Sequence, residues 1–326
     1  MTSKRSLVIH WAEQGNIPGQ ELLKAVAAVD ILPRAGDWRR FLDKLFLWLG
    51  ALALAFATLF FVAYNWDNLG RFAKFGAVQG LIVFSVAAYW RLGAEKLTAK
   101  ASLLVASILL GVLLALYGQT YQTGADPWQL FFYWALLILP WALVGRFASL
   151  WLVWVMLINV SIYLYFSTFG SWFWRLFSPV EQMFWVGFVF NAVALVGWEL
   201  LATRLSWLNE RWAVRIVALL GGSAITWLAV FTIISRREAH IASIPVYALS
   251  MLLLYYFYRR KIPDLFMLAA GCLSGIVVVT TLFGRMMLSG GGHSSSQGFL
   301  LLAFIVIAMG AGSAYWLRSI QRERMS

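Results

Sequence analysis

The sequence predicts an all-α membrane protein, a bundle of about ten transmembrane helices with a small N-terminal helical head in the cytoplasm. Three observations predict this fold. The chain of 326 residues is 62% hydrophobic and only 12% charged, whereas soluble domains are about half apolar and a quarter charged. Apolar runs of roughly 20 residues, the length that crosses the hydrocarbon core of a bilayer, recur along it. The basic residues gather in alternate gaps between these runs.

The N-terminal segment, residues 1–40, has a different pattern and is predicted to be a head of two short helices. The first helix ends at Gly15-Asn16, and Pro18 suits the first position of the second helix. The second helix carries an apolar stripe at helical spacing, formed by Leu22, Leu23, Val26 and Val29. Burying each such side chain is worth about 1.5–3 kcal/mol, so the stripe is expected to pack on another surface. Asp37 then suits the N-cap of the helix that becomes the first span.

Ten apolar runs after the head are predicted to cross the bilayer, in a membrane domain that we divide into residues 41–160 and 161–326. The runs cover approximately residues 45–64, 75–91, 101–118, 128–145, 147–166, 182–203, 212–234, 240–258, 262–283 and 297–317. The topology depends most on the second run and on the tight turn Gly145–Phe147. Losing either crossing would reverse the orientation of everything after it.

The basic residues set the predicted orientation. With the N-terminus in the cytoplasm, 20 of the 26 lysines and arginines lie on the cytoplasmic side of the membrane, which is the direction that the positive-inside rule requires. The six on the outer side are Arg71, Lys74, Arg175, Arg236, Arg237 and Arg285. Both termini are therefore expected in the cytoplasm.

Composition and motifs argue against several classes of function. The net charge of +12 comes from basic residues at the ends of apolar runs and not from a stripe on one face, so no nucleic-acid partner is expected. The lone cysteine, Cys272, lies in an apolar run and suits a packed residue. The histidines His10, His240 and His293 have no ligand-spaced partners, so no metal is expected. The chain shows no hydrolase, kinase or dinucleotide-binding motif, and we expect no catalytic residues, no cofactor and no enzymatic activity.

The polar residues within the spans bear on transport. Ionisable residues deep in a membrane helix are costly and usually functional. Here the acidic residues, such as Glu199 and Asp264, fall at or near span ends, where they can reach water or a neighbouring arginine. The mid-span polar residues are uncharged: Gln79, Ser85, Asn159, Ser161, Asn191, Thr226, Ser250 and Ser274. Such groups more often join helices than bind substrate, which counts against an ion-coupled transporter without excluding one.

Two predicted outer loops, Ala63–Gly70 and Tyr117–Trp128, carry the candidate binding residues. Both combine amides and carboxylates with flat aromatic rings, which suits a sugar or a peptide terminus, although the same residue types also build turns. Consecutive hairpins usually lie side by side, so the loops are expected to form one patch. Its residues are Asn65, Trp66, Asp67, Gln119, Tyr121, Gln122 and Asp126. Because Asp126 precedes Pro127, it is expected to sit outside the fourth span and to cap its first N–H groups.

The same loops carry a family resemblance. Ala63–Trp66 with Arg71–Phe75, and the longer segment Tyr117–Asp126, resemble the signature of a bacterial membrane protein family known as domain of unknown function 2157. The similarity covers roughly residues 6–160, which are the head and the first two helical hairpins. The resemblance implies a multi-pass protein of the bacterial inner membrane. It implies no activity and supplies no catalytic residues.

Three kinds of function stay open on the sequence alone. The preferred one is a non-enzymatic scaffold or accessory protein that contacts the bilayer and other membrane or envelope proteins through its head and outer loops. The second is a transporter or a lipid- or solute-handling protein, with a pathway between the first four helices and the last six. The third, an intramembrane transferase, would need an acidic or histidine site facing a cavity, and the sequence indicates none. A polar cavity at mid-membrane would favour transport, and a close-packed interior would favour a scaffold.

Overall fold

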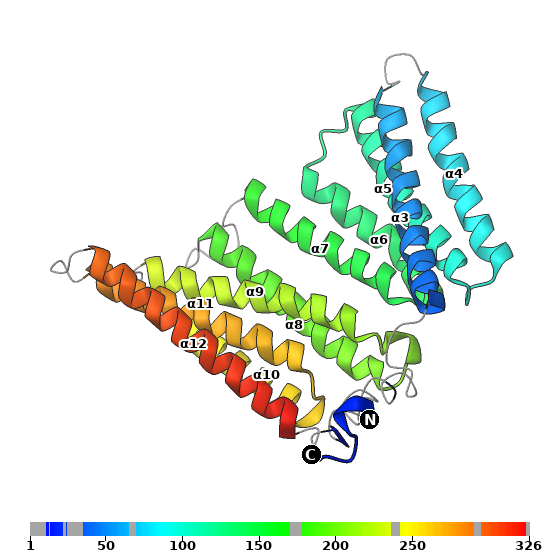
Figure 1. The fold of residues 1–326 in the computed structure, drawn as a ribbon. Coiled ribbons are helices and arrows are strands. Elements are labelled where there is room, and N and C mark those ends of the chain that lie inside the picture. Colours follow the sequence, from blue (N-terminus) through cyan, green and yellow to red (C-terminus); the bar gives the residue numbers. More distant parts are fainter. Residues whose placement is uncertain are drawn as a thin grey trace.

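Long helices account for the fold (Figure 1). The computed structural model describes residues 11–12, 14–21, 24, 35–64, 70–169, 178–235, 242–289 and 295–323. In this part of the chain all regular structure is helical, as predicted. Most of the predicted head lies outside the described residues, including all four residues of its apolar stripe, so the two-helix head stays a prediction. Within the head the structure describes a 3-10 turn, η1 (Gly19–Glu21).

Ten long helices follow the head in the described ranges. They are α3 (Ala35–Tyr64), α4 (Arg71–Leu92), α5 (Leu97–Tyr121), α6 (Pro127–Gly145), α7 (Ala148–Phe169), α8 (Pro179–Ala202), α9 (Arg211–Ser235), α10 (Ser243–Tyr256), α11 (Leu265–Ser289) and α12 (Ser295–Glu323). A 3-10 turn, η2 (Ser206–Leu208), precedes α9, and a π-helical turn, η4 (Phe257–Lys261), continues α10. Within the described residues nine of the helices are long and apolar enough to cross a membrane. The exception is α10, with 14 residues.

The segment formed by α10 and η4 runs back along α9. At the start of α10, the hydroxyls of Ser243 and Thr232, near the end of α9, share a hydrogen bond of 2.6 Å. Just beyond η4, Asp264 accepts a hydrogen bond of 3.1 Å from Arg211, the first residue of α9. The segment therefore returns the chain from one end of α9 to the other. Nine of the ten predicted spans therefore correspond to membrane-length helices in the described residues, and a crossing at residues 240–258 stays a prediction.

The two points on which the predicted topology depended most are as expected. Helix α4 is continuous, and α6 and α7 are separate helices that pack on each other. Their turn consists of Arg146, which has a left-handed φ of 50°, and Phe147, which is buried. Gly145 leaves room for this turn, because a Cβ there would lie 2.9 Å from Leu103 Cδ2 and 3.0 Å from the ring of Phe147.

The helices are arranged largely in chain order. In Figure 1, α3, α4 and α5 lie at one side of the molecule, α8 to α12 lie at the other, and α6 and α7 lie between them. Helices α3, α4 and α6 all pack on α5, which is the most buried of the described spans. Helix α7 packs on α6, α8 and α9, and it thereby joins the two groups.

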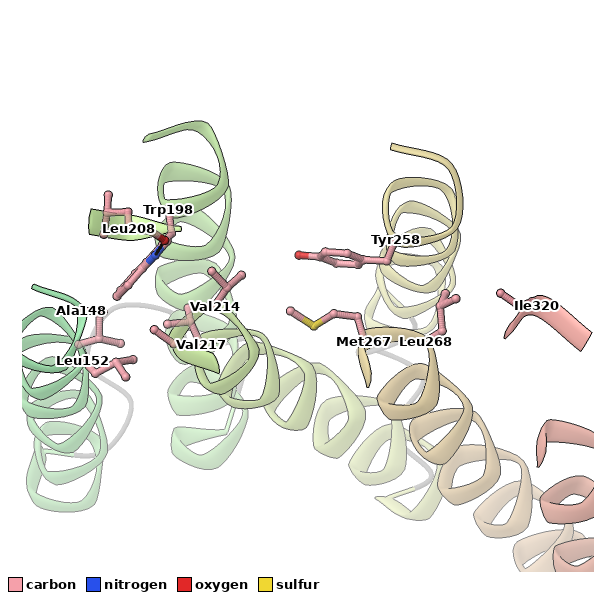
Figure 2. Close-up of a cluster of buried hydrophobic side chains, with 12 residues drawn as sticks. Ala148, Leu152, Trp198, Leu208, Val214, Val217, Tyr258, Met267, Leu268 and Ile320 are labelled. Carbon is pink, nitrogen blue, oxygen red and sulfur yellow. Dashed lines mark hydrogen bonds between the residues drawn. The ribbon is translucent and has the colours of Figure 1, made fainter. Parts of the chain in front are cut away.

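Two apolar clusters hold these groups together. One centres on α8, α9 and α11 (Figure 2), and its buried members include Trp198, Val214, Val217, Met267, Leu268 and Ile320. The other joins α4 to α7 and includes Tyr89, Leu103, Ile138, Leu150 and Leu157. Trp151 and Trp154 of α7 pack against both clusters. Because lipid is as apolar as these side chains, such contacts stabilise the bundle mainly through close packing.

The closest approach between α5 and α6 lies at Gly111. The indole of Trp134 on α6 covers this glycine and donates a hydrogen bond of 2.7 Å to the carbonyl oxygen of Ser107 on α5. A Cβ at position 111 would overlap the indole ring. The absence of a side chain at Gly111 is therefore what lets Trp134 reach the backbone of α5.

Helices α7 and α8 are joined by a pair of amides. The Nδ2 group of Asn191 donates to Oδ1 of Asn159 at 2.6 Å, and Nδ2 of Asn159 donates back to Oδ1 of Asn191 at 3.2 Å. Each amide also donates to a backbone carbonyl of its own helix, that of Gly187 or Val155. The mid-span asparagines are thus satisfied by helix-to-helix bonds, the role that the sequence favoured for uncharged polar residues.

The amide pair yields the first testable prediction. In a double-mutant cycle with Asn159→Ala and Asn191→Ala, we expect a favourable coupling of about 0.6–2 kcal/mol, the range measured for polar contacts between membrane helices. Reversible unfolding in mixed micelles would measure it. Ser250→Ala is the control for a polar group that does not join helices. Among its described partners, the Ser250 hydroxyl bonds only the carbonyl of Val246 on its own helix, so no coupling of Ser250→Ala with Asn159→Ala is expected. Fully additive costs for the two asparagines would contradict the prediction.

Candidate functional site

The structure describes part of the predicted outer patch. Gln119 and Tyr121 are exposed in the last turn of α5, and Gln122 ends that helix in a left-handed conformation with φ 45°. The Tyr121 ring lies 6.1 Å from the ring of Phe75 in α4, so the second motif contacts the segment Arg71–Phe75 of the first. Asn65, Trp66 and Asp67 lie outside the described residues. A single patch that includes all seven residues therefore stays a prediction.

Asp126 occupies the predicted position at the start of α6. It is the N-cap residue, with an extended backbone (φ −65°, ψ 147°), and Pro127 is the first helical residue. Its side chain, however, makes no capping hydrogen bond to the helix, so the predicted capping contact is corrected. The backbone carbonyl of Asp126 instead accepts from Gln129 N at 3.0 Å. The carboxylate is thus left partly exposed at the start of α6.

Three further residues at this end of α4, α5 and α6 carry buried polar groups. Lys74 of α4, one residue before Phe75, is only 6% exposed. Thr120 Oγ1 and Trp128 Nε1 are buried, and neither has a hydrogen-bond partner in the described part of the chain. Buried polar atoms are usually paired, so these two atoms are exceptions at this end of α5 and α6. The segment Tyr117–Trp128 stays a candidate binding segment.

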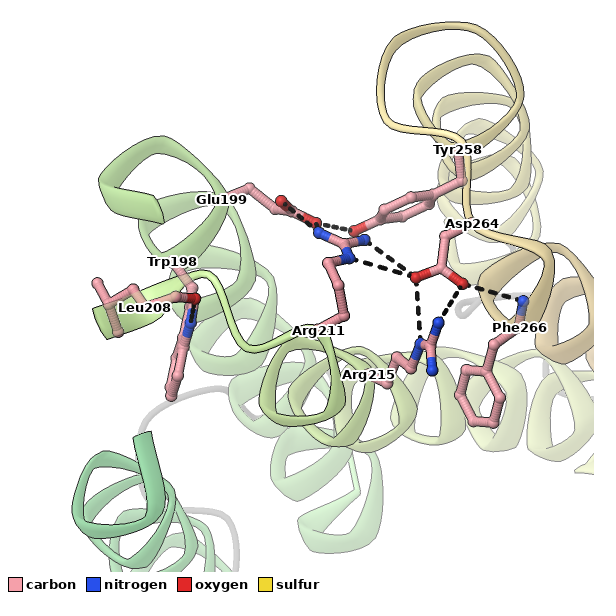
Figure 3. Close-up of polar contacts among 8 residues, drawn as sticks. All are labelled: Trp198, Glu199, Leu208, Arg211, Arg215, Tyr258, Asp264 and Phe266. Carbon is pink, nitrogen blue, oxygen red and sulfur yellow. Dashed lines mark hydrogen bonds and ion pairs between the residues drawn. The ribbon is translucent and has the colours of Figure 1, made fainter. Parts of the chain in front are cut away.

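A second polar site lies at the opposite end of the membrane domain, where α8 ends and α9 and α11 begin (Figure 3). We call it the charge cluster, and it consists of Glu199, Arg211, Arg215, Tyr258 and Asp264. Arg211 lies between the two carboxylates. Its Nη1 donates to both oxygens of Glu199 at 2.9 and 3.0 Å, and its Nη2 donates to Asp264 Oδ2 at 3.1 Å. Tyr258 completes the contact by donating its hydroxyl to Glu199 Oε1 at 3.0 Å.

Asp264 is the most buried carboxylate of the charge cluster, with a side chain only 3% exposed. Nε and Nη2 of Arg215 donate to its two oxygens at 3.1 Å each, and the backbone N–H of Phe266 donates to Oδ1 at 3.0 Å. Burial alone would raise the pKa of Asp264, but the hydrogen bonds and charges of Arg215 and Arg211 lower it below its ordinary value. The group is therefore held as a carboxylate at neutral pH.

The charge cluster has a chemical balance that favours a structural role. Two carboxylates face two guanidinium groups. Both arginines belong to the first turns of α9, and the other three residues come from α8, from η4 and from the loop before α11. The guanidinium of Arg215 also lies 5.2 Å from the centre of the Phe266 ring. Every charge is matched by a neighbour on another element, so the cluster ties four chain segments together at one membrane face.

The pH dependence of this cluster follows from the direction of the Asp264 shift. A carboxyl whose pKa is lowered by folding contributes stability above its unfolded pKa, here near 3.8, and loses it as the pH falls through the folded value. We expect Asp264→Asn to flatten the part of the stability profile below about pH 4 that this group produces. Thermal unfolding in detergent across that range would measure the change. An unchanged acid limb in the variant would contradict the ion-pair account.

Sequence reasoning placed Glu199 and Asp264 correctly at span ends, beside a neighbouring arginine, but did not identify their cluster. The residues that meet are up to 65 positions apart in sequence, from Glu199 to Asp264, and no spacing motif links them. The one available signal was the crowding of Arg211 and Arg215 one turn apart at the start of a span. Within the described ranges, no group of three or more histidine, cysteine or acidic side chains is placed to hold a metal ion.

A groove lies between α3, α4 and α5, on the same side of the membrane domain as the charge cluster. Its volume is about 390 Å³, and none of the described residues that line it is charged. Most of its lining is aliphatic or aromatic, with hydroxyls from Thr58, Ser85, Thr98 and Ser102. The groove forms because α3 packs on α5 and makes few contacts with α4. It is an apolar recess and not a polar passage.

The comparisons with known proteins agree with the membrane fold. Residues 10–151 match the model of a family described as predicted membrane protein (DUF2157), which covers nearly the whole of the resemblance found over residues 6–160. Neither curated proteins nor solved structures give a match to this chain. The matched segment includes α3 to α6 and both loop motifs. The similarity of this chain to the DUF2157 family of predicted membrane proteins therefore covers residues 10–151.

Proposed function

We propose that this multi-pass membrane protein is a non-enzymatic scaffold or accessory protein of the bacterial inner membrane, with both termini in the cytoplasm. Its head and its outer segment Tyr117–Trp128 contact other membrane or envelope proteins. The observation that carries this proposal is the charge cluster. Its ionisable groups, Glu199, Arg211, Arg215 and Asp264, pair with one another at the ends of helices.

The outer segment supports the contact role. Tyr117 and Tyr121 are about half exposed, and their ring centres lie 4.8 Å apart with the planes tilted by 45°, so they offer a preformed aromatic surface. Aromatic residues are enriched where proteins bind one another, because they bury a large area with little loss of side-chain freedom. The unpaired Thr120 hydroxyl and Trp128 indole add buried polar atoms beside that surface.

Site-specific photo-crosslinking in intact cells tests the proposal. A photoreactive residue at Gln119, exposed at the outer end of α5, is expected to give a protein adduct of defined mass. The same residue at Val193, which is 67% exposed in the middle of α8, serves as the lipid-facing control and is expected to give no such band. Equal results at the two positions would contradict a partner at the outer segment. Mass spectrometry of the adduct would then identify the partner.

The alternative function, a transporter or a lipid- or solute-handling protein, has one observation in its favour, the groove between α3, α4 and α5. The groove is apolar, so it suits a hydrocarbon chain and not a polar solute. Of the two forms of this alternative function, the groove therefore favours a lipid-handling protein and gives no support to an ion-coupled transporter.

A further inference from the structure

The groove between α3, α4 and α5 has the depth of one membrane leaflet. On α3 its lining runs from Phe46 to Thr58, and on α5 from Thr98 to Leu109. At 1.5 Å per helical residue, the α3 lining extends about 18 Å along the helix axis. Half of a hydrocarbon core of roughly 30 Å is about 15 Å. The groove therefore begins near one membrane surface and ends near the bilayer midplane.

One end of the groove is surrounded by cations. The groove begins at Phe46 within α3, at the start of α5 and at the end of α4, and the residues next to these points include Lys44, Arg91, Lys96 and Lys100. Lys44, Arg91 and Lys96 are exposed, and Lys100 is half-buried in the first turn of α5. Only two carboxylates, Asp43 and Glu95, lie within the same stretches of sequence, residues 43–44 and 91–100. This end of the groove therefore carries net positive charge.

We propose that the groove binds one anionic phospholipid from the adjoining leaflet. One acyl chain lies along the apolar lining, and the phosphate contacts the cations at the groove mouth. A protein helix in the groove would need no cations at the groove mouth. A lipid instead has an apolar chain, which suits the lining, and a negative headgroup at the end of that chain, which suits the cations. Figure 1 places α3, α4 and α5 at the edge of the molecule, where lipid has access. This inference does not depend on the scaffold role.

Binding to the groove and binding to the mouth are tested separately. The purified full-length protein is reconstituted in nanodiscs of equimolar phosphatidylglycerol and phosphatidylcholine, and native mass spectrometry counts the lipid that it retains. The wild-type protein is expected to retain one phosphatidylglycerol. Gly50→Leu places a side chain in the groove, where the Cβ meets no atom within 4 Å, and is expected to lower the retained fraction at least tenfold. Ala88→Leu, on the α4 wall, is a second variant with the same expected result.

Two matched controls decide the outcome. Gly80→Leu makes the same change on α4 at a position that also meets no atom within 4 Å and does not line the groove, so retention is expected to stay unchanged. Replacing Arg91, Lys96 and Lys100 together by Gln is expected to reduce the preference for phosphatidylglycerol over phosphatidylcholine to about one, whereas Arg318→Gln with Arg322→Gln on α12 leaves it intact. Equal retention in Gly50→Leu, Ala88→Leu and Gly80→Leu would overturn the groove site. A preference that survives the triple substitution would overturn the headgroup contact, and with it the proposal.

Discussion

Replacing Asp264 by asparagine is expected to lower the free energy of unfolding by about 3 kcal/mol. The substitution keeps an oxygen that can accept the N–H of Phe266 but removes the charge that Arg211 and Arg215 share. Removing one partner of a buried ion pair typically costs about 3–5 kcal/mol, because the other charge stays buried without compensation. The two arginine side chains are 32% and 38% exposed, so the lower end of that range is expected. Unfolding in mixed micelles would measure the loss.

A surface ion pair provides the control for Asp264→Asn. Glu323 lies 2.6 Å from Arg259, but its side chain is 61% exposed, and exposed pairs contribute little because water screens them. Glu323→Gln is therefore expected to leave the unfolding midpoint nearly unchanged. If the two variants were equally stable, the charge cluster would contribute no more than a surface contact, and its proposed role in tying the helices together would be wrong.

Substituting Gly111 by alanine is expected to destabilise the protein by about 2–4 kcal/mol. Alanine is the better helix former, yet its Cβ would overlap the Trp134 indole that covers this position. Inserting a methyl group into a packed interior typically costs about 1–3 kcal/mol. Displacing the indole would also cost its hydrogen bond to Ser107, worth about 1 kcal/mol. The near-ultraviolet circular dichroism of the indole would report its displacement beside the change in stability.

The matched control is Gly80→Ala on α4. A Cβ at Gly80 meets no atom within 4 Å, so only helix propensity changes, and the stability is expected to stay the same or to rise by less than about 1 kcal/mol. A similar loss of stability in Gly111→Ala and Gly80→Ala would mean that the close packing of α5 and α6 at Gly111 does not cause the destabilisation.

The membrane-length helices could largely be predicted from the sequence because their physical causes are local. Apolar length decides whether a segment crosses the bilayer, and the clustering of basic residues decides which way it faces. Even the tight turn at Arg146 and Phe147 was found from the break between two apolar runs. Helix α10 shows the limit of run length as a signal: the sequence predicts a span over residues 240–258, but the α-helix has only 14 residues and continues into the π-helical turn η4.

The sites could be predicted less well because they depend on contacts between distant segments. The sequence drew attention to Tyr121 and Asp126 through their loop motif, but the missing side-chain cap of Asp126 is a matter of rotamer and surroundings. Arg211 and Asp264 are 53 positions apart, and only the parallel packing of α9 and α11 brings them together. The groove also follows from tertiary packing, since it requires α3 to pack on α5 instead of α4.

The most direct test determines on which side of the membrane two exposed positions lie. In a Cys272→Ser background, Thr123→Cys marks the outer end of α5, and Arg260→Cys marks η4 at the opposite face. An impermeant maleimide applied to the outside of intact spheroplasts is expected to label position 123 and to leave position 260 unlabelled until the membrane is opened. Labelling of position 260 from outside, or protection of position 123, would contradict the ten-crossing topology with basic helix ends in the cytoplasm.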